Sequence, residues 1–210
     1  MEIGPTPTEN TVPLRISGFS TLAEALDYAA KGATGCNFYG DQGELHAVLP
    51  YADLREQARS LARRLLSLGL ERGSRVAIVA DTDPDFQRFF FACQYAGLVP
   101  VPLSASLLIS GHKRYVTQLR ALLANCQPSV AVAGPEFFPF LSEAAEGLEL
   151  DHIGTAEAFM CLPEVQRELE PLGSTEMAYI QYTSGSTLLP RGVMITQSAV
   201  IANLEGILAQ

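Results

Sequence analysis

The sequence predicts an α/β protein with a doubly wound, mostly parallel sheet that is flanked by helices. Short apolar segments suited to buried strands alternate along the chain with amphipathic segments suited to helices. Proline and glycine stand where helices begin and end. With 210 residues, 48% of them hydrophobic, the chain can form one sizeable core or a large piece of a bigger domain. We expect a loose N-terminal arm at residues 1–20 and one α/β unit at residues 21–210.

The N-terminal part is expected to contain a hairpin, a helix and a strand. After modest helical character at Leu22–Lys31, the apolar segments Cys36–Tyr39 and Leu45–Leu49 flank a Gly/Asp turn, which predicts a hairpin. Apolar residues then recur at helical spacing, and Gly69 is expected to end that helix. These apolar residues are Leu54, Ala58, Leu61, Ala62 and Leu65. Arg75–Ala80 has the pattern of a short buried strand.

A second helix is marked at both ends. Asp83 is a candidate N-cap, Pro84 occupies the first helical position, and Gly97 is expected to stop the helix. One face carries Phe86, Phe89, Phe90 and Cys93. At helical spacing such a row belongs to the core more often than to an aromatic ligand site. The next strand, Leu98–Leu103, contains two prolines and is therefore expected to be short or at a sheet edge.

The remaining elements continue the alternation. We expect strands at Ser129–Ala133, Leu148–Ile153, Met177–Thr183 and Gly192–Thr196, and helices over Val116–Cys126, after Pro135 and over Ser198–Leu208. Leu162–Ser174 is rich in proline and glutamate and is the best linker candidate. It leads into Met177–Thr183, which we expect to be the central strand.

Composition excludes several classes of function. A net charge of -9 at pH 7 argues against binding of nucleic acid or an anionic membrane, because both require a cationic surface. The four cysteines and three histidines are scattered, so we expect reduced, mostly buried thiols and no metal site. The N-terminus lacks the pattern of a signal peptide, and no apolar segment is long enough to span a bilayer. These features favour a soluble, cytoplasmic protein.

A polar loop follows the expected strand Met177–Thr183, a common position for ligand sites in open α/β sheets. The segment QYTSGSTLLPRGVMITQ supplies hydroxyl donors from Thr183, Ser184, Ser186 and Thr187, and a permanent positive charge from Arg191. Gly185 allows close backbone approach, and successive amides in such a turn can form a nest for an anion. The loop is either a plain strand connection or a polyphosphate site. It matches no Walker, dinucleotide-binding or nucleophile-elbow pattern.

The segment YTSGST followed by PRGV resembles the phosphate-binding signature of the adenylate-forming superfamily, whose usual form is TSGSTGxPKG. Leu188 replaces the second glycine of that signature, and Arg191 replaces the lysine. The upstream segments GSRVAIV and FFFACQYAGLVPVPL are also similar to the family, so the resemblance covers most of the chain. Within the superfamily, the sequence is most similar to fatty acyl-AMP ligases in the segments FFACQYAGLVPVPL and PRGVMITQ. Gln197 also fits that branch, because it stands where many relatives have histidine.

This resemblance implies that the full-length enzyme activates a fatty acid with ATP, forming acyl-adenylate and pyrophosphate, and passes the acyl group to an acyl carrier protein. It places the enzyme in lipid metabolism or in polyketide or lipopeptide biosynthesis. It assigns contacts with the ATP phosphates to Thr183, Ser184, Gly185, Ser186, Thr187, Arg191 and Gly192. The family's catalytic lysine and magnesium ligands lie downstream of Gln210, so no catalytic residue is expected in this chain.

Two other functions remain open: a fragment of an acyl- or aryl-CoA synthetase, and a truncated, non-catalytic paralogue that binds nucleotide or a carrier protein. For the leading interpretation we expect an N-terminal fragment that is inactive alone and whose loop is poorly ordered without ligand. We also expect the isolated chain either to form a homodimer through apolar surface left open by truncation or to cover that surface by rearrangement.

Overall fold

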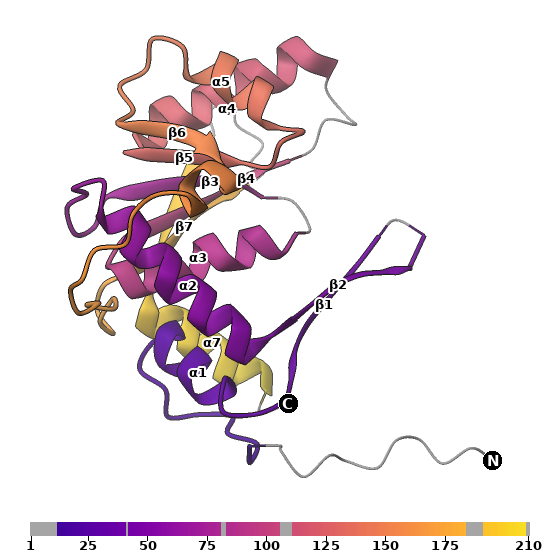
Figure 1. The fold of residues 1–210 in the computed structure, drawn as a ribbon, viewed down its shortest axis with the longest axis vertical. Coiled ribbons are helices and arrows are strands. Elements are labelled where there is room, and N and C mark those ends of the chain that lie inside the picture. Colours follow the sequence, from indigo (N-terminus) through magenta and orange to yellow (C-terminus); the bar gives the residue numbers. More distant parts are fainter. Residues whose placement is uncertain (1–11, 41, 81–82, 106–110, 184–190, 209–210) are drawn as a thin grey trace.

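The computed structural model describes residues 12–40, 42–80, 83–105, 111–183 and 191–208 (Figure 1). The helices are α1 (Leu22–Ala29), α2 (Tyr51–Leu66), α3 (Pro84–Ala96), α4 (Gly111–Cys126), α5 (Phe138–Ala145), α6 (Ala156–Met160) and α7 (Gln197–Leu208). The strands are β1 (Gly35–Tyr39), β2 (Leu45–Pro50), β3 (Arg75–Ala80), β4 (Val99–Ser104), β5 (Val130–Ala133), β6 (His152–Thr155), β7 (Met177–Thr183) and β8 (Arg191–Thr196).

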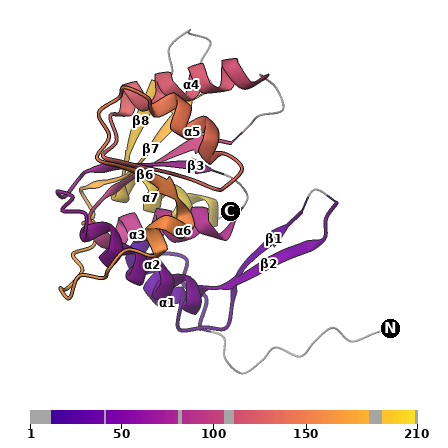
Figure 2. The same ribbon diagram turned by 45° about the horizontal axis from the view of Figure 1, so that its top comes forward.

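The centre of the fold is a four-stranded parallel sheet with the strand order β4-β3-β5-β6. Side chains of β3 alternate between its two faces. Val76 and Ile78 pack with α1, α2, α3 and α6, whereas Ala77 and Val79 pack with α4 and α5. Helices therefore cover both faces of the sheet (Figure 2), and the predicted doubly wound α/β architecture is confirmed.

Helix α3 begins and ends as its sequence predicts. The Asp83 side chain accepts a hydrogen bond of 2.6 Å from the backbone N–H of Asp85, and Pro84 opens the helix. Gly97 ends it in the left-handed conformation, at φ 71°. Of the predicted apolar face, Phe89 and Cys93 are fully buried, which confirms their assignment to the core. Phe86 and Phe90 are half-buried, with their ring centroids 5.9 Å apart.

The two prolines predicted that this strand is short or at a sheet edge; β4 has six residues and is an edge strand of the parallel sheet. The N–H of Val99 donates to the carbonyl of Ser74, and β4 continues in parallel register with β3. Alternate residues of a strand direct their N–H groups to opposite sides, so the missing N–H groups of Pro100 and Pro102 belong to the side away from β3. The outer edge of β4 thus lacks two of the donors that a further strand would need.

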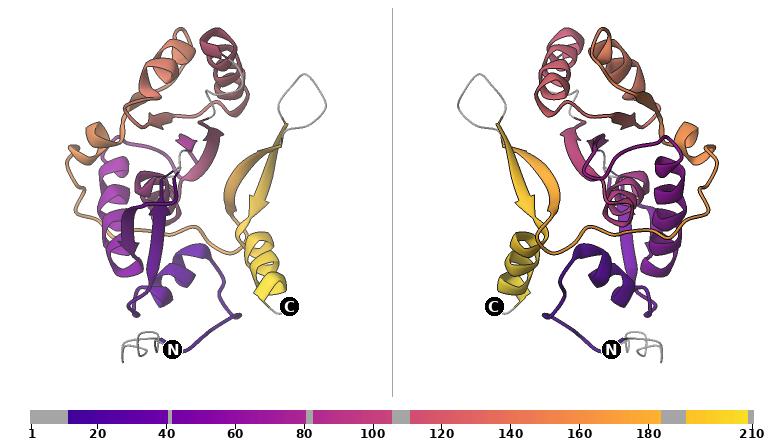
Figure 3. Two further views of the ribbon diagram at one scale, coloured as in Figure 1. Left: turned by 90° about the vertical axis from the view of Figure 1, so that its right-hand side faces the viewer. Right: turned by 90° about the vertical axis from the view of Figure 1, so that its left-hand side faces the viewer.

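The prediction that Met177–Thr183 forms the central strand is wrong. This strand, β7, contacts β4 but pairs antiparallel with β8 in a separate two-stranded sheet. Figure 3 shows this hairpin and α7 beside the body of the fold. The donors missing from the outer edge of β4 give a physical reason why β7 packs against that edge without extending the ladder. The β1–β2 hairpin, in contrast, was predicted correctly and extends away from the body (Figure 2).

The predicted linker Leu162–Ser174 contains no helix or strand, and Arg72 holds its C-terminal end to the body. The Arg72 guanidinium donates to the backbone carbonyls of Glu170 and Pro171 and pairs with the Glu176 carboxylate at 2.6 Å. This bond lowers the pKa of Glu176. The segment that leads into β7 is therefore fixed by an ion pair to the loop before β3.

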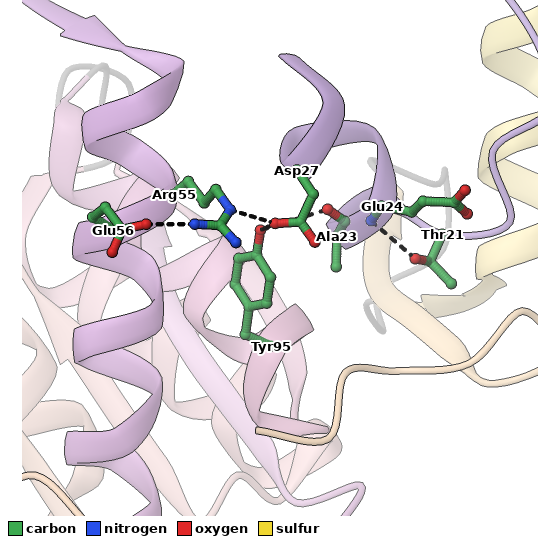
Figure 4. Close-up of polar contacts among 7 residues, drawn as sticks. All are labelled: Thr21, Ala23, Glu24, Asp27, Arg55, Glu56 and Tyr95. Carbon is green, nitrogen blue, oxygen red and sulfur yellow. Dashed lines mark hydrogen bonds and ion pairs between the residues drawn. The ribbon is translucent and has the colours of Figure 1, made fainter. Parts of the chain in front are cut away.

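The predicted N-terminal arm is only partly described, because residues 1–11 lie outside the described residues. Residues 12–20 have no helix or strand, and the Tyr28 hydroxyl donates to the carbonyl of Pro13 at 2.8 Å. Helix α1 then joins the body through Asp27 (Figure 4). Its carboxylate accepts from Arg55 of α2 at 2.6 Å and from the Tyr95 hydroxyl of α3 at 2.8 Å.

Two fully buried glutamines connect the sheet, the hairpin and the N-terminal helix. Gln94 of α3 and Gln197 of α7 are both 0% exposed. Gln197 Nε2 donates to Gln94 Oε1 at 2.5 Å, and Gln94 Nε2 donates to the carbonyl of Ala178 in β7 at 2.9 Å. The backbone N–H of Leu22 donates to Gln197 Oε1 at 3.0 Å. Each amide therefore bonds through both its oxygen and its nitrogen inside the core.

We predict that Gln94→Leu destabilises the chain by about 1–3 kcal/mol, because it leaves the amide of Gln197 and the carbonyl of Ala178 buried without their partner. Gln118→Leu, on the exposed face of α4, is the matched control and should change the free energy of unfolding by less than about 0.5 kcal/mol. Urea denaturation of the variants measures both values. Equal stability of the two variants would contradict the role given to Gln94.

Candidate functional site

The ends of the β7–β8 hairpin bring two predicted site residues together. The antiparallel register places Thr183, the last residue of β7, directly opposite Arg191, the first residue of β8. Both residues are exposed. Four further residues of the predicted set lie outside the described residues: Ser184, Gly185, Ser186 and Thr187. The prediction that their loop is poorly ordered concerns these residues and therefore stays a prediction. The structure thus places Thr183, Arg191 and Gly192 of the predicted set at the mouth of the hairpin.

Gly192 is required by close packing. It lies opposite Tyr182 in the ladder, and a Cβ atom there would come within 2.9 Å of Ile180 Cγ2 and 3.4 Å of the Tyr182 ring. The absence of a side chain lets these two residues of β7 cover the backbone of β8. The sequence placed Gly192 in the phosphate-binding signature, and the structure shows what its size does there.

Tyr182 fixes the hairpin to the body next to the loop. Its hydroxyl donates to Asn125 Oδ1 of α4 at 2.6 Å. Burial raises the pKa of Tyr182, and the nearby Cys126 thiol raises it further, so the phenol keeps its proton at neutral pH. Burial also raises the pKa of Cys126, to about 11. Sequence reasoning missed this contact, because no local pattern links Tyr182 to a residue so distant in the chain.

The donor set at the hairpin mouth suits phosphate oxygens. Arg191 carries a permanent charge and pairs with none of the carboxylates in the described part of the chain. Its planar guanidinium can donate two parallel hydrogen bonds to a phosphate, and the hydroxyl of Thr183 can add a third. Both side chains are held on paired strands, which limits their movement relative to each other.

A cavity of about 400 Å³ lies away from the hairpin, at the carboxyl ends of β3 and β5. The chain leaves these adjacent strands toward opposite faces of the sheet, the geometry at which α/β proteins often form ligand crevices. Apolar residues such as Ile78 and Phe89 line this cavity together with the carboxylates of Asp83, Asp85 and Glu136. Those carboxylates would repel phosphate, so the polyphosphate prediction stays with the hairpin.

The described ranges contain no group of three or more His, Cys, Asp or Glu side chains that could hold a metal ion. No helix within them combines the length and apolar character needed to cross a bilayer. All four cysteines are free; Cys93 and Cys126 are buried, Cys36 is half-buried and Cys161 is exposed.

We predict that Tyr182→Phe destabilises the chain by about 0.5–1.5 kcal/mol, because it removes the hydrogen bond to Asn125 but keeps the ring over Gly192. Tyr179→Phe is the matched control, since Tyr179 lies in the same strand and its ring contacts Phe90. Its free energy of unfolding should stay within about 0.5 kcal/mol of the wild-type value. A Tyr182→Phe variant as stable as the control in thermal and urea denaturation would contradict the anchoring contact.

Comparison with curated proteins finds relatives over most of the chain. A Caulobacter vibrioides protein whose name assigns it to the acyl-CoA synthetases is 38% identical over 96% of this chain and 35% of its own length. A 4-hydroxybenzoate/benzoate-CoA ligase of Rhodopseudomonas palustris is 33% identical over 72% of this chain and 29% of its own length. JamA of Moorena producens, a medium-chain fatty acid–acyl carrier protein ligase, is 31% identical over 87% of this chain and 32% of its own length.

Solved structures share the fold. One from a study of fatty acyl-adenylate ligases of E. coli and L. pneumophila is 43% identical, with a TM-score of 0.88 over 93% of this chain and 35% of its own. The chain therefore spans about a third of the length of its relatives. The family model described as AMP-binding enzyme matches residues 38–210, a range that includes the β7–β8 hairpin. The chain belongs to the AMP-binding enzyme family.

Proposed function

We propose that the whole protein is a fatty acyl-AMP ligase, which activates a fatty acid with ATP and transfers it to an acyl carrier protein. The observation that carries this proposal is the placement of Arg191 opposite Thr183 at the mouth of a hairpin within the matched family region. The 43% identity to a fatty acyl-adenylate ligase structure supports the fatty acid as substrate, and the similarity to JamA supports a carrier protein as acceptor.

In the proposed reaction, a carboxylate oxygen of the fatty acid attacks the α-phosphorus of ATP, and the bond to the β,γ-pyrophosphate breaks. Arg191 would offset the negative charge of the departing pyrophosphate, and the hydroxyl of Thr183 would orient one of its oxygens. Ser184, Gly185, Ser186, Thr187 and Gly192 complete the proposed set of phosphate contacts. When bound, Mg²⁺ would neutralise further negative charge on the phosphates. We propose that its protein ligands lie outside these 210 residues.

A CoA synthetase is the second candidate function, and the relatives from C. vibrioides and R. palustris favour it. Both candidates share the adenylation half-reaction and differ in the thiol that accepts the acyl group. Incubation of the whole protein with ATP and fatty acid, and then with either CoA or a holo acyl carrier protein, distinguishes them. Acyl-CoA as the sole product would reject the carrier-protein proposal and retain the adenylation proposal.

The wider setting is also proposed. Four free cysteines fit a reducing compartment, and we place the protein in the cytoplasm. The name of JamA supports a medium-chain fatty acid as substrate and a carrier protein as acceptor. We place the enzyme in lipid metabolism or in polyketide or lipopeptide biosynthesis. Within the chain we propose an N-terminal arm at residues 1–20 and an α/β unit at residues 21–210.

We predict that the isolated 210-residue chain self-associates. Val193 and Met194 of β8 are 47% and 67% exposed, and Ile207 of α7 is 61% exposed. Strand β8 also has no ladder partner on its outer edge within the described residues. Burial of any of these side chains in a homodimer would remove apolar area from water. Light scattering should show a dimer that Met194→Lys weakens, whereas a monomer at high concentration would contradict the prediction.

We predict that Arg191→Ala lowers the rate of adenylation by the whole protein by roughly 10²-fold, because the pyrophosphate loses its charged donor. The KM for the fatty acid should change less, since Arg191 is proposed to meet phosphate and not the acyl chain. ATP–pyrophosphate exchange measures the rate, and Arg114→Ala, at an exposed position of α4, is the control for loss of a positive charge.

The same assay tests the 210-residue chain by itself, which we propose to be inactive. An unchanged exchange rate for Arg191→Ala would remove this residue from the phosphate site. Fatty-acid-dependent exchange by the isolated chain would show that these residues suffice for adenylation, against the proposal.

A further inference from the structure

A groove with an excess of arginines lies between α2 and the segment that follows α6. Its volume is about 480 Å³. It is lined by Arg59, Arg63, Gln166, Arg167, Glu168 and Leu169. We call it the arginine groove, and its three arginines are Arg59, Arg63 and Arg167. Three positive charges face one carboxylate there, on a chain whose net charge is -9. The local charge is therefore opposite to that of the whole protein.

Four other arginines in the described structure have acidic partners. Carboxylates lie within 2.9 Å of the guanidinium groups of Arg55, Arg64, Arg72 and Arg88. In the described ranges, none of the three groove arginines forms an ion pair. Arg59 instead lies 5.5 Å from the Tyr95 ring centroid, and Arg63 donates to the carbonyl of Arg59 at 3.4 Å.

Packing and helix electrostatics account for only part of this arrangement. Arg63 lies in the last turn of α2, where the helix dipole favours a positive charge. Arg59 and Arg63 are four residues apart on one helix, a spacing at which like charges repel. Arg167 belongs to a segment without helix or strand, so no helix dipole explains it. All three guanidinium groups therefore keep N–H donors that bond to no carboxylate of the described chain.

We propose that the arginine groove binds a multivalent, phosphate-bearing anion. Guanidinium forks donate pairs of hydrogen bonds to phosphate oxygens, and an anion with several charges would relieve the repulsion among the three arginines. The volume lies within the range of small-molecule sites. Figure 3 shows α2 and the β7–β8 hairpin on opposite sides of the molecule, so this site is separate from Thr183 and Arg191. The proposal does not depend on the adenylation chemistry.

Inorganic tripolyphosphate is the probe, titrated into the 210-residue chain while the Nε–Hε signals of the arginines are followed by NMR. The titration uses an Arg191→Ala background, so that binding at the hairpin cannot mimic binding at the groove. We expect saturable shifts of the signals of Arg59, Arg63 and Arg167. Arg167→Gln should weaken binding about three- to tenfold, because it removes one charged donor in an open groove.

Lys113→Gln is the matched control, because it removes one exposed positive charge from α4 and should leave the affinity unchanged. ATP and sulfate serve as further arms. Tighter binding of tripolyphosphate or ATP than of sulfate supports a multivalent phosphate ligand, and the ratio of the first two distinguishes a free polyphosphate from a nucleotide. Non-saturating shifts, equal affinity for sulfate, or equal weakening by Arg167→Gln and Lys113→Gln would overturn the proposal.

Discussion

The buried pair of glutamine amides, Gln94 and Gln197, is the interaction that the arrangement of the hairpin depends on. It joins helix α3 on one face of the parallel sheet to β7, to α7 and to the start of α1. A buried amide without a partner is costly, so this set of bonds is satisfied in only one relative placement of the four elements. The amides add directional bonds to the close apolar packing around them and so help to specify the positions of these elements.

This constraint matters because β7 is not held by a ladder to the parallel sheet. Pro100 and Pro102 deprive the outer edge of β4 of two backbone donors, so the β7–β8 hairpin is positioned by side chains. Gln94 and Gln197 fix its base, and Tyr182 fixes the other end to α4. The residues proposed to contact phosphate lie just beyond that second anchor. Because residues outside the loop hold the hairpin in place, the loop itself need not stabilise the fold. Its sequence can instead supply hydrogen-bond donors to a ligand.

Charge is distributed unevenly over a chain that is acidic as a whole. Several arginines are used structurally, and Arg72 shows how: it holds the segment before β7 through Glu176 and two backbone carbonyls. Arg191 and the arginine groove differ, because they direct guanidinium groups at no carboxylate in the described residues. In both candidate anion sites such a guanidinium group has a second donor close by: Thr183 lies opposite Arg191, and the groove brings three arginines together.

The sequence alone determined what is local. Periodicity and caps predicted α3 from Asp83 to Gly97. The prolines predicted that β4 is short or at a sheet edge, and it is an edge strand. The signature at Thr183–Gly192 predicted the family and the candidate phosphate contacts. Tertiary structure decided what depends on residues far apart in the chain. Three such features have no local pattern in the sequence that predicts them. They are the Gln94–Gln197 pair, the contact between Tyr182 and Asn125, and the separation of β7 from the parallel sheet. The physical reason is that propensity and periodicity depend only on residues that are close in the sequence. A hydrogen-bond partner or a vacant strand edge comes from residues that are brought together only when the chain folds.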